Sequence, residues 1–164
     1  MKKKQKRSIA LAVIGTIAIA LVIIFNYSAE QTRVQGFNFG NELLQIQEDL
    51  KDLQEEFEAN FSMYNDGDLT KEKFLEFAPS HIKQMEDLIL RYDNLSPSSS
   101  FVDSVDLLKL SAESQLESQK RLFSWVETGD EADFIIANMT HQQSFEFEMA
   151  GLASYNEAKA GNQP

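Results

Sequence analysis

The hydrophobic residues divide the chain into one long apolar run and a longer region of helical periodicity. The run, residues 9–25, contains no charged residue, and the basic sequence of residues 2–7 stands directly before it. After residue 40, apolar residues recur every three or four positions, the spacing that places them on one face of an α-helix. No stretch alternates with the period of two that a half-buried strand needs. The pattern therefore predicts an all-α protein.

Turn-forming sequences divide the periodic region into four predicted helices. The turns are residues 65–68 (Asn-Asp-Gly-Asp), 96–100 (Ser-Pro-Ser-Ser-Ser) and 128–130 (Thr-Gly-Asp). Thr70 and Asp130 are predicted to cap the helices that follow them. Pro79 predicts a kink or a split in the second helix, because proline cannot donate the backbone hydrogen bond of a helix interior. Four long helices with short loops are typical of an antiparallel up-down bundle.

Residues 9–26 are predicted to form a single transmembrane helix. The segment 8–27 would rise about 30 Å at about 1.5 Å per residue, which matches the hydrocarbon thickness of a bilayer. Basic residues precede the segment, so the positive-inside rule places the N-terminus in the cytoplasm and the remaining chain outside. A cleaved signal peptide is the alternative, but its apolar region is usually only about 7–15 residues long.

These predictions give a linear domain organisation. It consists of a cytoplasmic basic tail (1–8), the anchor (9–26), a juxtamembrane segment (27–40), an acidic helical bundle (41–160) and a short tail (161–164). The juxtamembrane segment contains Gly36 and Gly40 and is interpreted as flexible, with a helix that continues unbroken from the membrane as the alternative. The expected location is the cell membrane, with an extracytoplasmic C-terminal domain.

The charge distribution restricts the partners. Beyond the anchor the chain carries 10 lysines and arginines against 26 aspartates and glutamates, a net charge of −16 with neutral histidines. This charge argues against nucleic acid, whose binding proteins present basic surfaces, and against docking onto anionic lipid. We therefore expect two kinds of partner: the membrane itself, through the single span, and a protein, either another chain or a second copy.

Motifs of catalysis and of metal binding are not found in the sequence. Residues 66–70 resemble the middle of a calcium loop, but carboxylates do not stand at the first, third and last ligand positions. His81 and His141 lack the glutamate three residues earlier that di-iron bundles use, and they are interpreted as surface or boundary residues. No nucleophile signature and no glycine-rich phosphate loop occurs. The sequence predicts no enzyme activity, no metal and no cofactor.

A set of amide side chains stands at positions that the helical pattern directs inward. The set comprises Asn60, Gln115, Gln119, Asn138 and Gln142. If they converge, they form a hydrogen-bonded layer that fixes the helix register, or they line a small ligand pocket. A shift of one residue would instead direct Leu116 or Met139 inward and leave the amides in solvent. The sequence leaves these interpretations open.

Four Asn-x-Ser/Thr sequons offer acceptor sites for N-glycosylation, at Asn26, Asn60, Asn94 and Asn138. Pro97 follows the third sequon, so the candidate sites are Asn26, Asn60 and Asn138, although helical periodicity also directs Asn60 toward the core. The sequons favour an outer surface in an organism that glycosylates its envelope.

Three stretches resemble a recurring type of uncharacterised envelope protein: residues 123–130 (FSWVETGD), 137–144 (ANMTHQQS) and 148–153 (EMAGLA). These are small, N-terminally anchored helical proteins of archaea and some bacteria. The resemblance implies the membrane address and the helical fold, and it implies no activity. The N-terminus also resembles type IV pilin-like proteins, except that Ser8 stands where their peptidase prefers Gly or Ala, and Val13 where the bacterial type has Glu.

The first functional hypothesis is a membrane-anchored interaction module whose acidic bundle engages another envelope protein or a small ligand. The alternative is a self-associating structural envelope protein, in which the anchor and the apolar seam Phe39–Tyr64 pair between copies. A pilin-like subunit and a small-ligand-binding bundle rank below both.

Overall fold

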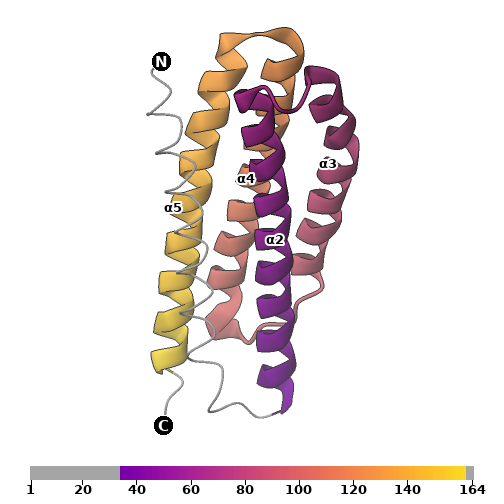
Figure 1. The fold of residues 1–164 in the computed structure, drawn as a ribbon. Coiled ribbons are helices and arrows are strands. Elements are labelled where there is room, and N and C mark those ends of the chain that lie inside the picture. The colour runs from indigo at the N-terminus through magenta and orange to yellow at the C-terminus, as the bar shows by residue number, and fades with distance from the viewer. Residues whose placement is uncertain (1–33, 162–164) are drawn as a thin grey trace.

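The computed structural model describes residues 34–161, and this part of the chain is all helical (Figure 1). The helices are α2 (Val34–Asp66), α3 (Lys71–Asp93), α4 (Val102–Thr128) and α5 (Glu131–Gly161), with a 3-10 turn η1 (Ser99–Phe101) before α4. Successive helices run in opposite directions along a common axis (Figure 1). Close packing joins α2 to α3, α3 to α4 and α4 to α5. The prediction of an all-α fold is confirmed.

The predicted anchor, residues 9–26, lies outside the described residues. Within residues 34–161, no helix contains an apolar stretch long enough to cross a bilayer.

The ends of the helices follow the predicted turn chemistry. Gly67 and Gly129 adopt left-handed backbone conformations, with φ of +84° and +79°, which glycine reaches without a steric cost. The Thr70 hydroxyl accepts a hydrogen bond from the backbone amide of Lys73 at 3.3 Å. Asp130 Oδ1 accepts one from the amide of Ala132 at 2.9 Å. Both predicted N-caps are therefore confirmed.

Two boundary predictions need correction. Helix α2 begins at Val34, so Gly36 and Gly40 are helical rather than part of a flexible segment. Helix α3 passes through Pro79 as one continuous helix, so the predicted split is wrong, and the predicted kink stays a prediction. Ala78 and His81, on either side of this proline, are buried against the bundle. Packing of a buried face stabilises a helix more than intrinsic propensity opposes it, and this explains the continuity.

The core consists of an aliphatic end and an aromatic end. The aliphatic end contains residues of all four helices, among them Leu43, Ile46, Met85, Leu108 and Leu152. The aromatic end, near the α2–α3 turn, is built on Phe57, Phe74 and Phe123. The α2 seam that self-association was expected to use is thus buried inside one copy of the chain. That part of the hypothesis is wrong, because α3 and α4 already cover the seam.

Small side chains line the contact between α4 and α5. They recur at intervals of seven residues on both helices: Ser104, Ser111 and Ser118 on α4, and Ala137, Ser144 and Gly151 on α5. The Ser118 hydroxyl donates a hydrogen bond to the backbone oxygen of Ala137 at 2.8 Å. A Cβ atom placed on Gly151 would lie 2.9 Å from Leu108 Cγ. The two backbones therefore approach closely, and this contact fixes which face of α5 turns inward.

Candidate functional site

The structure brings together only two of the five amides singled out in the sequence. Gln115 and Gln119 are buried, with exposed fractions of 6% and 2%. Asn60, Asn138 and Gln142 instead form hydrogen bonds along their own helices near the surface. In α5 the close approach of α4 leaves room for Ala137 and Ser144 but not for an amide, so the neighbouring polar residues turn outward.

A buried polar network is centred on Gln54, a residue that the sequence patterns did not single out. Gln54 Oε1 accepts hydrogen bonds from Nε2 of Gln115 and from Nε2 of Gln119, the latter at 2.9 Å. Gln119 Oε1 lies 2.9 Å from His81 Nε2. Because the Gln119 amide group is directed to Gln54, its oxygen faces the ring, and His81 Nε2 must carry the donated proton. The network joins α2, α3 and α4.

His81 is completely buried, so its assignment to the surface or boundary is wrong. Its ring contacts Phe57, Phe77 and Phe123, with centroid separations of 5.3, 4.9 and 6.3 Å. Burial among these rings lowers the pKa of His81, although the bond to Gln119 opposes the shift. The imidazole is therefore neutral at pH 7. The helical spacing from Phe74 and Met85 was the sequence signal that places residue 81 inward.

Glu58 extends the network toward the surface. Gln54 Nε2 donates to Glu58 Oε1 at 2.7 Å, whereas Glu58 Oε2 is buried without a hydrogen-bond partner. Burial raises the pKa of this carboxyl. No group of side chains suited to holding a metal ion occurs in residues 34–161. The three glutamine amides therefore form a layer that links α2 to α4 through hydrogen bonds, whereas Glu58 Oε2 and His81 Nδ1 at its edges are buried without a hydrogen-bond partner.

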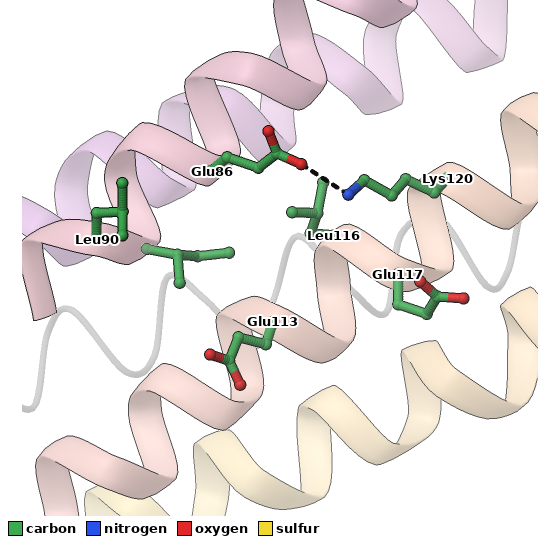
Figure 2. Close-up of a pocket in the computed structure, with 7 residues that line it drawn as sticks. Glu86, Leu90, Glu113, Leu116, Glu117 and Lys120 are labelled. Carbon is green, nitrogen blue, oxygen red and sulfur yellow. Dashed lines mark hydrogen bonds and ion pairs between the residues drawn. The ribbon is translucent and has the colours of Figure 1, made fainter. Parts of the chain in front are cut away.

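A groove of about 310 Å³ lies between α3 and α4 (Figure 2). Its apolar part is formed by Ile89, Leu90 and Leu116, and carboxylates stand around it. Each carboxylate has a cation of the same chain nearby: Glu86–Lys120 at 2.8 Å, Glu117–Arg121 at 2.8 Å and Glu113–Lys109 at 3.8 Å. Because these charges are matched internally, the groove offers a charged partner little electrostatic gain.

The outward face of α5 differs from this groove. A line of eight residues separated by steps of three or four runs along it, and every one is exposed. We call it the outward stripe: Glu131, Ile135, Met139, Gln142, Glu146, Met149, Ala153 and Glu157. Ile135 is 58% exposed and Met139 is 67% exposed. Exposed Ile136 and Phe145 widen the apolar surface on either side. A contiguous apolar surface on a folded domain is typical of an interaction site.

The charges on the outward stripe are all negative. Glu131, Glu146 and Glu157 stand at its two ends and near its middle. The sequence contains no lysine or arginine between Arg121 and Lys159. The stripe therefore combines large apolar side chains with carboxylates, and no cation stands among its own residues.

Two of the three candidate glycosylation sites lie on described helices. Asn138 is exposed in the first third of α5, and Asn60 is partly exposed near the end of α2. Asn26 lies outside the described residues.

Comparisons with protein-family models, with curated proteins and with solved structures find no match to this chain.

Proposed function

We propose that this protein is a single-pass membrane-anchored interaction module that presents its acidic helical bundle on the extracytoplasmic side. The apolar run 9–25 and the basic residues before it support the anchor and its orientation. On this proposal the complete fold is one transmembrane helix followed by the up-down bundle of α2–α5.

The outward stripe of α5 carries the proposal of an interaction role. Its isoleucine and methionines lie outside the core of a single copy, with exposed fractions of 58% for Ile135, 67% for Met139 and 49% for Met149. Burying the exposed part of such a side chain would return roughly half to two-thirds of the 1.5–3 kcal/mol that full burial contributes, about 1–2 kcal/mol per residue. Contact with another protein supplies that burial.

The same stripe also supports a second candidate, a self-associating envelope protein. Anchoring in one membrane raises the effective concentration of neighbouring copies, which favours pairing without a strong intrinsic affinity. The buried α2 seam plays no part in this candidate.

Site-specific photo-crosslinking in cells separates the two candidates. A photoreactive residue replaces Met139 on the stripe, and in a control it replaces Gln84, an exposed residue of α3. We expect a specific envelope protein to be recovered from position 139 and not from position 84. Recovery of only the protein's own copies would favour self-association.

The topology is tested separately. The chain has no cysteine, so a single Ser62→Cys substitution in an exposed part of α2 provides one thiol. We expect a membrane-impermeant maleimide to label it in intact cells. Labelling only after lysis would show that the bundle lies inside.

A further inference from the structure

We infer that the outward stripe of α5 binds a basic amphipathic helix of another protein. The inference rests on the proposed interaction role and names the chemistry of the partner. Two features of the stripe carry it: the helical spacing of its positions, which include three large apolar side chains, and the sign of its charges.

The positions of the stripe have the geometry of a helix–helix contact. Positions 135, 139, 142, 146 and 149 follow steps of four, three, four and three residues; three of them are apolar (Ile135, Met139 and Met149), and Gln142 and Glu146 stand between these. This is the spacing with which one helix packs along another. From Ile135 to Met149 the stripe extends about 21 Å at about 1.5 Å per residue, or about four turns of a partner helix. Methionine side chains adapt to varied apolar surfaces, so the stripe suits a helix of differing side-chain shapes.

The charges select a basic partner. Three carboxylates interrupt the stripe at Glu131, Glu146 and Glu157, and the nearest lysine or arginine in sequence beyond them are Arg121 and Lys159. A helix with lysine or arginine beside its apolar face would neutralise these carboxylates and would be drawn to a domain of net charge −16. The α3–α4 groove lacks this property because its carboxylates already have cations.

The same charges disfavour a second copy as the occupant. Two chains anchored in one membrane would align their α5 helices in parallel and place Glu146 of each opposite the other. Juxtaposed like charges oppose association. A lipid surface is disfavoured too, because an acidic face is repelled by anionic headgroups.

The test uses the full chain in nanodiscs of phosphatidylcholine and two synthetic probes. One probe is a 14-residue Leu/Lys peptide of helical amphipathic pattern, and the other replaces every lysine by glutamate. Binding is measured by fluorescence anisotropy, with empty nanodiscs as the background. We expect the Leu/Lys peptide to bind and the Leu/Glu peptide not to bind.

Two variants and a matched control identify the site. Ile135→Gln with Met139→Gln and Met149→Gln is expected to weaken binding of the Leu/Lys peptide roughly tenfold or more, because it removes the central apolar contacts. The second variant reverses the three charges of the stripe, Glu131→Lys, Glu146→Lys and Glu157→Lys. We expect it to bind the Leu/Glu peptide more tightly than the Leu/Lys peptide. The control reverses three exposed carboxylates elsewhere, Glu42→Lys, Glu56→Lys and Glu72→Lys, and is expected to keep the original preference.

Each contrary result has a defined meaning. If the two charge-reversal variants had equal effects, the net charge of the protein alone would explain the binding. That result would overturn the inference. Absence of binding, or stripe-dependent association of the chain with itself, would overturn it as well. A crosslinked partner at position 139 whose contact segment is not a basic helix would overturn the inference but leave the proposed function standing. Absence of any partner specific to position 139 would contradict both.

Discussion

The two faces of α5 are built from opposite kinds of residue. Toward α4 it presents small residues, such as Ala137 and Gly151, in a contact that leaves no room for a Cβ atom at position 151. Away from α4 it presents Ile135, Met139 and Met149 to solvent. Three large apolar side chains are therefore on a face that the bundle does not use, whereas Leu152 of the same helix lies in the core. The small residues of the inward face allow α5 to approach α4 closely. The outward face carries apolar side chains that the bundle does not bury.

The largest effect is expected at the close contact. Gly151→Leu should lower the free energy of unfolding by about 3 kcal/mol, the upper end of the cost of overpacking, because even a Cβ atom meets Leu108. The matched control is Ala153→Leu on the outward face of the same helix, expected within about 0.5 kcal/mol of the parent. Chemical denaturation of the full chain in nanodiscs, followed by circular dichroism, measures both. Equal losses in the two variants would remove the distinction between the faces.

The same comparison of a buried with an exposed position can be made for the polar network, at Gln54 and Gln45 of α2. Gln54→Leu should cost about 1–3 kcal/mol in total, because Gln115 and Gln119 both donate to Gln54 and would lose this shared acceptor. Gln45→Leu, at an exposed position of the same helix, is the control and should be nearly neutral. A neutral Gln54→Leu variant would mean that the network contributes nothing to stability.

Glu148 lies beside the inward face of α5, and burial raises its pKa to about 7. Because the folded state holds this proton more tightly than the unfolded state, the contribution of Glu148 to stability falls as pH rises from about 4.5 to about 7. Glu148→Gln should therefore stabilise the protein at pH 8 by about 2 kcal/mol, less than the full shift because water still reaches the side chain. The gain should shrink toward pH 4.5. Denaturation of the parent and the variant at several pH values measures it, and a gain that is independent of pH would contradict the assignment.

The smallest effect on stability is expected on the outward stripe. Met139→Gln should change the free energy of unfolding by less than about 0.5 kcal/mol, because its side chain is 67% exposed. It should nevertheless reduce partner-specific crosslinking from a photoreactive residue placed at the neighbouring position Gln142. A loss of stability at position 139 comparable to that at position 151 would show that the stripe belongs to the core.

Part of the candidate site was accessible from the sequence. Gln115 and Gln119 were singled out by their spacing, and they do lie in the buried network. Gln54 and His81 were not, because single polar residues on an apolar face are common and the pattern does not show which of them will meet. Asn138 and Gln142 were grouped with the network because α5 is apolar on nearly every side. Periodicity does not select the inward face of such a helix.

The sequence by itself determined the helical class, the turns, and the caps at Thr70 and Asp130, because these depend on local spacing and on hydrogen bonds between near neighbours. Only the tertiary structure decided the rotation of α5 and the exposure of Met139. The physical reason is that small residues at intervals of seven let α4 and α5 approach closely. That contact, made between residues distant in sequence, turned Ala137 and Gly151 inward and left Ile135, Met139 and Met149 facing out.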